Sequence, residues 1–458
     1  MRKAMPAHIC RAGWRPAVAL CLLAAGSPGV FAGDAGPAQK TMTLTLSQAI
    51  ELALKNNLQA RLAAERVAEA RGAKGMALSA LLPNLSGSAY QMDLTVNLAA
   101  MGFSPKNLPG IPIPMFVGPF NRFDARMQLV QSIFNLSSIR RYQAGDRGLA
   151  AAEQARRQAA QQVTAAAALA YLMVLEAQQA VAASEANVQL AERLLALARS
   201  RREAGVATGI DVARAETRLA SQQVQLAQAR TQLDSARLAL LRVTGAPLSA
   251  RLELTEGLRF DAEPLPGVEK AVEQALADRA DVKAAREQLR AAEAEYKAAV
   301  AGWLPSVSFF GDYGSSGLRP NELSLPTRSV GVRLDVPLFN GGRTRSEIQM
   351  AASRRRQAEA QFADLRAAVE KEVREALDHL STRAQQVQAA RSALALAERE
   401  LELAQDRFRN GLADNIEVVN AQTALENARQ GWVASLALFN MARLNLAVAM
   451  GHAEDFKL

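Results

Sequence analysis

The sequence predicts a mainly helical chain that also carries membrane-type β-strands, and it predicts this arrangement twice over. Three observations support the prediction. The chain of 458 residues repeats the same order of parts in its two halves. Four segments alternate apolar and polar residues, as the strands of a membrane β-barrel do. Two long segments keep apolar residues seven positions apart, which is the spacing of coiled coils.

The N-terminal segment, residues 1–32, reads as a secretory signal peptide. Basic residues precede a short apolar run, and small residues at the −3 and −1 positions predict cleavage near Ala32. Both cysteines, Cys10 and Cys21, lie in this segment, and Leu20 before Cys21 argues against a lipid-modified cysteine. We therefore expect an exported mature chain without disulfides.

The charge and the titratable residues exclude several classes of function. A formal net charge of +9 is mild for a chain of 458 residues, so nucleic acid is not an expected partner. The only histidines after the signal peptide are His379 and His452, which are far apart in sequence. No metal site, cofactor site or nucleophile–base set is visible, so the sequence does not predict an enzyme.

An internal repeat organises the chain. Residues 201–245 align without gaps on residues 407–451, so that Gly205 meets Gly411 and Ile210 meets Ile416. Earlier in each half, Leu82-Pro83 corresponds to Leu304-Pro305. We expect the following parts: a first repeat over 42–247, a proline-rich linker over 248–267, and a second repeat over 268–452.

Each repeat opens with a helix and continues with two strands. The first helices are expected over about 46–81 and 268–303, because both patterns end at Leu-Pro. Strands are expected over about 86–98, 123–134, 306–313 and 328–338. In the first strand, Tyr90, Met92 and Leu94 are expected on one apolar face. The same alternation also fits a half-buried sheet of a soluble protein, but the long proline-containing loops between paired strands favour membrane hairpins.

Long helices follow the strands, at 138–202 and 344–408, and shorter helices follow at 209–245 and 415–450. At about 1.5 Å per residue each long helix would span roughly 95 Å. Val387, Leu394 and Leu401 recur at coiled-coil spacing. Between the helices, Gly205 and Gly411 fit the left-handed position that ends a helix. Thr208 with Asp211, and Asp414 with Glu417, have capping-box spacing. Each glycine segment therefore predicts a helix–turn–helix reversal.

The four predicted strands are too few to close a membrane β-barrel by themselves. A bilayer leaves no backbone group unpaired, so strands cross it only as a closed barrel, and single-chain barrels begin at about eight strands. Two or three copies of the chain would have to share one barrel. No transmembrane helix is expected, because the apolar run Val163–Leu175 is too short and Val433–Met450 contains polar residues.

The order of parts resembles the TolC-like outer-membrane efflux protein family over about residues 42–452. The same resemblance is carried by the two Leu-Pro pairs, by Pro337-Leu338-Phe339-Asn340-Gly341-Gly342, and by Glu417-Val418-Val419-Asn420-Ala421 after Gly411. It implies an outer-membrane homotrimer with a twelve-stranded barrel, a periplasmic α-helical barrel and an equatorial belt that includes 248–267. It also implies a passive exit duct that works with a periplasmic adaptor and an inner-membrane transporter.

The resemblance also implies that the two reversals form the periplasmic tip, where the family closes its pore and meets its adaptor. Asp211 matches an acidic position of the family's closing network. Phe408 stands where the family has tyrosine and Ala413 where it has arginine, so this network is not expected here. Apolar contact of Phe408 is one alternative for closure. Glu417 and Asn420 occupy the family's constriction positions, where three copies of Glu417 could form a cation-favouring ring. A helix cap is the other role open to Glu417.

Three functions stay open on the sequence: an efflux duct, a type I protein secretion duct, and a periplasmic coiled-coil scaffold whose strands form a soluble sheet. The first is the leading hypothesis, and the choice of cargo is not decided by this chain.

Overall fold

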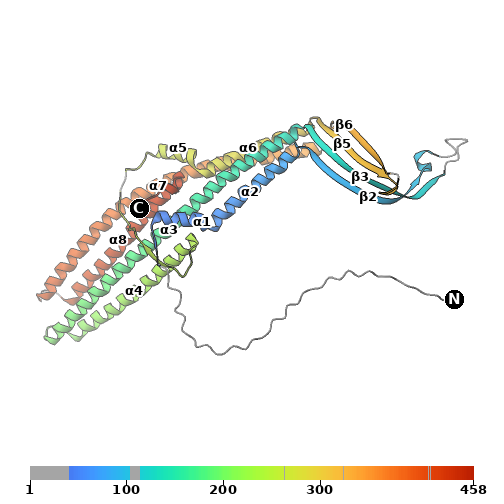
Figure 1. Ribbon diagram of the computed structural model, residues 1–458. Coiled ribbons are helices and arrows are strands. Elements are labelled where there is room, and N and C mark those ends of the chain that lie inside the picture. The colour runs from blue at the N-terminus through green and yellow to red at the C-terminus, as the bar shows by residue number, and fades with distance from the viewer. Residues whose placement is uncertain (1–40, 104–113, 262–263, 323, 411, 413) are drawn as a thin grey trace, which may run out of the picture. The chain divides into compact units, whose positions relative to one another are not determined.

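The computed structural model describes residues 41–458 except 104–113, 262–263, 323, 411 and 413 (Figure 1). The expected signal peptide lies outside the described residues. The described chain belongs to one compact unit, Thr41–Leu458. Its elements occur in the same order in the two halves, which confirms the internal repeat.

Four strands form one antiparallel sheet in the order β2–β3–β5–β6: β2 (Asn84–Asn97), β3 (Phe116–Phe134), β5 (Ser306–Gly317) and β6 (Leu325–Asp335). The sheet joins both repeats, because β3 pairs with β5. Strands β3 and β5 are longer than the alternation of the sequence indicated. A second sheet, not expected from the sequence, pairs β1 (Thr41–Leu44) in parallel with β4 (Arg251–Leu254).

The register of the sheet assigns side chains to its two faces, because directly opposite residues share a face. Tyr90 lies opposite Asp124 and Met92 opposite Arg122, on the charged side of the sheet. Tyr90, Met92 and Leu94 share one face as expected, but the expectation that this face is apolar was wrong, because it carries Asp124 and Arg122. A register shift between Leu94 and Val96 interrupts the alternation, so no single face could run through residues 90–98.

The other side of the sheet is apolar and open. Leu129 lies opposite Leu85 and opposite Gly311, and Val332 lies opposite Phe309. Six large apolar residues on this side are 58–69% exposed: Leu85, Met127, Tyr313, Val330, Val332 and Leu334.

Two helices of about one hundred ångströms continue from β3 and β6: α3 (Leu136–Glu203) and α7 (Arg343–Arg409). After each long helix the chain turns back into a shorter helix: α4 (Gly209–Thr244) follows α3, and α8 (Asn415–Met450) follows α7. Since α3 and α7 begin beside the strands, their reversals lie at the helix ends farthest from the sheet. Short 3₁₀ turns occur at Ala99–Met101, Ala301–Trp303 and Ala453–Asp455.

The first helix of each repeat is divided. Helices α1 (Leu46–Asn56) and α2 (Leu58–Ser79) flank Asn57, and α5 (Val268–Asp278) and α6 (Ala280–Val300) flank Arg279. The expectation of single helices over 46–81 and 268–303 was wrong. Asn57 and Arg279 have extended backbones, with ψ of 135° and 130°. The Asn57 side chain caps α2 by accepting from the N–H of Gln59 at 2.8 Å.

The main core lies where α3, α4 and α8 meet the β1–β4 pair. Tyr171, Leu172 and Leu240 are fully buried there, and the Tyr171 hydroxyl donates to the carbonyl of Leu44 at 3.2 Å. In the described part of the chain, α3 and α8 each contain an 18-residue stretch apolar enough to cross a membrane, and these stretches are 44% and 50% buried inside the protein. Their apolar residues pack in this core and in the neighbouring clusters.

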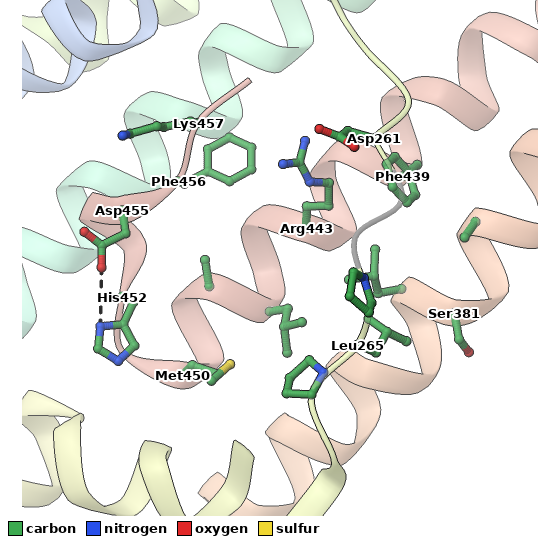
Figure 2. Close-up of a pocket in the computed structure, with 16 residues that line it drawn as sticks. Asp261, Leu265, Ser381, Phe439, Arg443, Met450, His452, Asp455, Phe456 and Lys457 are labelled. Carbon is green, nitrogen blue, oxygen red and sulfur yellow. Dashed lines mark ion pairs between the residues drawn. The ribbon is translucent and has the colours of Figure 1, made fainter. Parts of the chain in front are cut away.

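A cavity of about 550 Å³ lies between the linker, α7, α8 and the C-terminal segment (Figure 2). Leu265, Phe439 and Met450 give it an apolar wall. Arg443 and Phe456 also line it, and the guanidinium of Arg443 lies 5.8 Å from the ring centre of Phe456. The linker is therefore packed against the helices and does not hang free of them.

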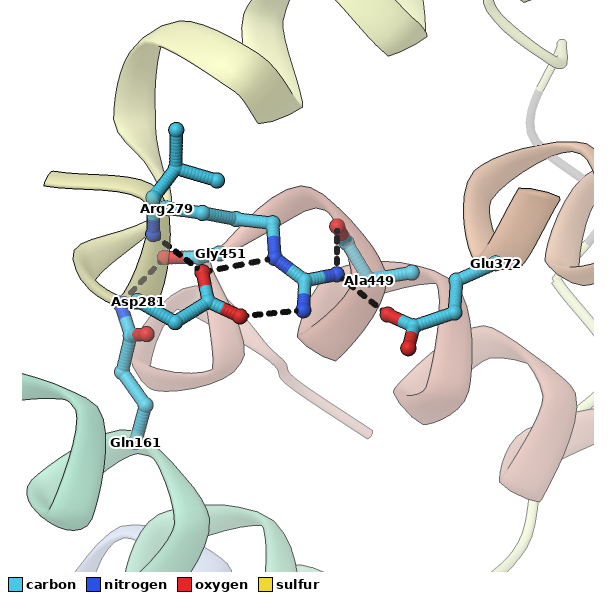
Figure 3. Close-up of polar contacts among 7 residues, drawn as sticks. Gln161, Arg279, Asp281, Glu372, Ala449 and Gly451 are labelled. Carbon is cyan, nitrogen blue, oxygen red and sulfur yellow. Dashed lines mark hydrogen bonds and ion pairs between the residues drawn. The ribbon is translucent and has the colours of Figure 1, made fainter. Parts of the chain in front are cut away.

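Arg279 ties the break between α5 and α6 to two other helices (Figure 3). Its guanidinium donates twice to Asp281, once to Glu372 of α7 at 2.6 Å, and once to the carbonyl of Ala449 of α8 at 3.1 Å. The equivalent residue of the first repeat, Asn57, donates to the carbonyl of Val243 of α4 at 3.2 Å. Both repeats thus anchor the helix break on the last turn of the helix that ends the repeat.

Candidate functional site

We call α3 with α4 hairpin 1, and α7 with α8 hairpin 2. The turn of hairpin 1 is made by Gly205, whose φ of +74° suits glycine. The N–H of Gly205 donates to the carbonyl of Arg202 at 3.0 Å, and the N–H of Val206 donates to that of Arg201 at 2.9 Å. These two bonds form a Schellman motif, which satisfies the last carbonyls of α3.

Thr208 and Asp211 begin the next helix of hairpin 1. The Asp211 carboxylate accepts from the Thr208 N–H at 2.9 Å and from the Thr208 hydroxyl at 2.6 Å. These hydrogen bonds hold the pKa of the Asp211 carboxyl below its usual range. The carboxylate is thereby ionised and fixed at the positive end of α4.

Hairpin 2 turns in a related way, but its cap differs. Gly411 and Ala413 lie outside the described residues. The N–H of Leu412 donates to the carbonyl of Arg407 at 2.9 Å, which matches the bond from Val206 to Arg201. Asp414 begins α8 without a side-chain cap hydrogen bond.

The capping box expected between Asp414 and Glu417 is therefore absent. The Glu417 carboxylate lies 3.2 Å from Nε of Arg407, in a pair in which both side chains are about half exposed. Asp414 has a carboxylate where Thr208 has a hydroxyl, so it cannot donate to Glu417 as Thr208 donates to Asp211. Glu417 turns to the arginine of its own hairpin, while Asn420, one turn further along α8, is exposed.

Phe408 lies between the two hairpins. Its side chain is 7% exposed and packs with Leu401, Val418 and Leu425 of hairpin 2 and with leucines of hairpin 1. The Arg201 guanidinium stands 4.2 Å from the centre of the Phe408 ring, and Arg201 also donates to the Phe408 carbonyl. Phe408 thus fills the interior of one chain.

Several hairpin contacts were not expected from the sequence. Arg218 of α4 pairs with Glu426 of α8 and donates to Thr423 at 3.1 Å. Further from the turns, Arg429 of α8 donates to Asn187 of α3 at 2.9 Å. The sequence did contain an indication that Arg201 belongs to this site, because Arg201 and Arg407 occupy the same place in the two repeats.

The architecture just described is that of an outer-membrane channel subunit with periplasmic helical hairpins. The sequence profile of the family "Outer membrane efflux protein" matches residues 49–246 and 271–452. The chain belongs to this family, and it is accordingly an outer-membrane protein. The resemblance to this family is confirmed, as is the expected chain fold of long helices and four strands in an internal repeat.

Relatives named for efflux and for protein secretion resemble this chain to a similar degree. The probable efflux pump outer membrane protein TtgC of Pseudomonas putida is 26% identical over 440 residues, covering 93% of this chain and 86% of that protein. The alkaline protease secretion protein AprF of Pseudomonas aeruginosa is 24% identical over 399 residues, covering 85% of this chain and 81% of that protein. The CmeC outer membrane channel of Campylobacter jejuni has the same fold, with a TM-score of 0.78 at 20% identity, over 89% of this chain and 86% of CmeC.

Proposed function

We propose that three copies of this chain form a passive exit duct through the outer membrane. The observation that supports it most is the four-stranded sheet, whose order leaves β2 and β6 each with one edge that no described strand pairs. Unpaired strand edges are not tolerated in hydrocarbon, so each edge must pair with another copy. Three copies give a twelve-stranded barrel, which leaves an aqueous lumen where eight strands would fill their interior with side chains.

The two faces of the sheet fit this barrel. The exposed apolar face would contact lipid, and the opposite face would line the lumen. On that opposite face Arg126 of β3 pairs with Asp124 and lies 3.1 Å from Asp312 of β5. Such an ion-paired surface suits water and would be costly against lipid.

The reversals of the two hairpins would form the inner mouth of the duct. The turns expose four aliphatic side chains, which are 52–71% exposed: Val206, Ile210, Leu412 and Ile416. They occupy equivalent places in the two repeats. We propose that this apolar surface receives a periplasmic adaptor, and that an inner-membrane transporter drives cargo into the duct. Small-molecule efflux and protein secretion both fit, since the toluene efflux pump outer membrane protein TtgC and the alkaline protease secretion protein AprF resemble the chain about equally.

We infer that the chain conducts without catalysing a reaction. Within the described ranges, no group of three or more His, Cys, Asp or Glu side chains is placed to hold a metal ion. The inference itself rests on the duct architecture.

A matched pair of variants tests the barrel. Val330 and Ser329 are neighbours on β6 that point to opposite faces, because side chains alternate along a strand. Lysine on the lipid face costs about 2–4 kcal/mol at mid-membrane. We expect Val330→Lys to prevent trimer recovery from outer membranes, while Ser329→Lys still yields trimers that conduct ions in planar bilayers. A wild-type protein that is extracted as a monomer without detergent would contradict the duct and favour the scaffold.

A further inference from the structure

A groove between α3 and α6 lies at the ends of these helices nearest the sheet. Its volume is about 480 Å³, and its charged lining consists of four cations and two carboxylates: Arg140, Arg147, Arg290, Lys297, Asp146 and Glu293. Arg140 lies four residues after the start of α3, and Lys297 lies three residues before the end of α6. Both are therefore within about 6 Å of the ends of their helices, measured along the helix axis.

Several of these charges already have partners, and two cations do not. The ion pairs in and around the groove are Arg147–Glu287, Arg290–Glu287 and Lys74–Asp146. Among the described residues, Arg140, Lys297 and Glu293 form no ion pair, and Arg140 donates only to the neutral Gln143, at 2.8 Å. The end of the groove nearest the sheet thus carries two cations from different helices that no carboxylate of the described chain neutralises.

The groove lies on the side of the helices that would face outward in a duct. Helices α2, α3, α6 and α7 pack side by side in this order, so the groove lies in the middle of one chain (Figure 1). Asp146, Arg157 and Ala168 of α3 are eleven residues apart, which is close to three turns, so they share one side of the helix. Arg157 lines a hollow together with His452 of the C-terminal segment, and Ala168 packs in the main core with the β1–β4 pair. These segments must lie outside a duct, because inside it they would fill the lumen.

The chain between the groove and the sheet is apolar and exposed. Trp303, between α6 and β5, is 44% exposed, and Leu338 and Phe339, between β6 and α7, are 87% and 88% exposed. Exposed apolar side chains in one region indicate an apolar partner, and tryptophan is enriched where a membrane meets water. The headgroup layer on each side of the hydrocarbon is about 5–8 Å thick. Arg140 and Lys297 are therefore at the depth of the headgroups if the sheet spans the membrane.

We propose that Arg140 and Lys297 bind the phosphate of a glycerophospholipid in the periplasmic leaflet, one lipid on each chain. The proposal rests on the proposed function, because it needs the sheet to close into a membrane barrel. The acyl chains of the lipid lie along the apolar face of the sheet. The planar guanidinium of Arg140 can bind two phosphate oxygens, and the Lys297 ammonium adds a point charge. Glu293, one turn farther from the sheet, accepts from a hydroxyl or amine of the headgroup beyond the phosphate.

Free phosphate has the same charge chemistry, but the position of the groove favours a lipid. The two unpaired cations lie at the end of the groove that adjoins the exposed apolar junction, where a phosphate joined to acyl chains can use both surfaces. Inorganic phosphate would gain nothing from the apolar junction. A comparison of lipids with and without a phosphate therefore separates the two ligands.

The test measures lipid binding to purified full-length trimers by native mass spectrometry. The probes are dioleoyl phosphatidylglycerol, dioleoylglycerol, which lacks the phosphate, and inorganic phosphate. A basic residue near a membrane surface contributes about 1 kcal/mol, so we expect Arg140→Gln and Lys297→Gln each to weaken phosphatidylglycerol binding about fivefold. Dioleoylglycerol binding should not change, and Arg140→Lys, which keeps the charge, should stay within about twofold of wild type.

Arg141→Gln is the matched control. Arg141 is exposed and stands at the same level of α3, but it lies two residues from Gln143 of the groove and so points about 200° away from it. We expect this variant to bind phosphatidylglycerol like wild type. An equal loss for Arg141→Gln and Arg140→Gln would overturn the site, since it would show only general attraction to charge. Inorganic phosphate that displaces the lipid at equal concentration would also overturn it.

The same spectra distinguish failure of this site from failure of the duct. They report the mass of the assembly, so a variant that does not assemble is recognised, and Lys297→Gln on the other helix then decides the result. Wild-type trimers that conduct ions but bind phosphatidylglycerol no more tightly than dioleoylglycerol would overturn the lipid site and leave the duct intact. A wild-type protein that is a monomer would contradict the duct, and the lipid site with it.

Discussion

Removing Arg407 should make the proposed pore more selective for cations. We propose that Glu417 lies at the constriction of the duct, where three copies would form an acidic ring. Arg407 lies 3.2 Å from each carboxylate and offsets its charge. Coulomb attraction at this separation is about 1.3 kcal/mol in bulk water. Exposed ion pairs contribute only about 0.2–1 kcal/mol, and this pair is about half exposed on both sides. The pair is therefore formed most of the time, but it is readily broken.

The assay is the reversal potential of single channels under a KCl gradient. We expect Arg407→Ala to shift it toward cation selectivity, Glu417→Ala to weaken cation preference relative to wild type, and the double variant to return near wild type. The differences should be large at about 0.1 M salt, where the Debye length is about 10 Å, and small at about 1 M, where it is about 3 Å. Equal reversal potentials for wild type, Arg407→Ala and Glu417→Ala at the lower salt concentration would refute an acidic ring at Glu417.

Three further predictions concern stability. Gly205→Ala should destabilise trimers to urea by about 1 kcal/mol per chain because of its positive φ, whereas Gly209→Ala, inside α4, should not. Arg279→Met should leave the Glu372 carboxylate unpaired and loosen the α5–α6 break. Because Arg279 also binds the Ala449 carbonyl, amide exchange at the end of α8 should become faster. Burial raises the pKa of Glu176, so the folded chain favours the protonated carboxyl. The free energy of unfolding should therefore fall as pH rises from about 4.3, the pKa of an unperturbed glutamate, through the raised pKa. Glu176→Gln should remove that loss, and trimer melting between pH 4 and 8 checks it.

The sequence predicted the repeat, the strands and the reversals because each has a strong local signal. Alternation over many residues marks the strands, and heptads mark the long helices. The breaks at Asn57 and Arg279 carry no proline or glycine, and their apolar pattern continues on both sides. At each break the side chain reaches a carbonyl of another helix, at Val243 and at Ala449, and such long-range contacts leave no local signal. The β1–β4 pair was missed for a similar reason, since strands of four residues are defined mainly by a distant partner.

The candidate site was only partly predictable, and the reason lies in the repeat itself. Aligning the two halves correctly places Arg201 with Arg407 and Asp211 with Glu417, but it does not say which groups bind each other. That choice depends on one further pair, Thr208 and Asp414. A hydroxyl at the first position holds the local carboxylate and leaves the arginine free to cross to the other hairpin. Asp414 at that position offers no such hydroxyl, and Glu417 pairs with the arginine of its own hairpin. The two halves can therefore share the same backbone fold while the arginines at their turns bind different partners. The difference between Thr208 and Asp414 distinguishes the two turns.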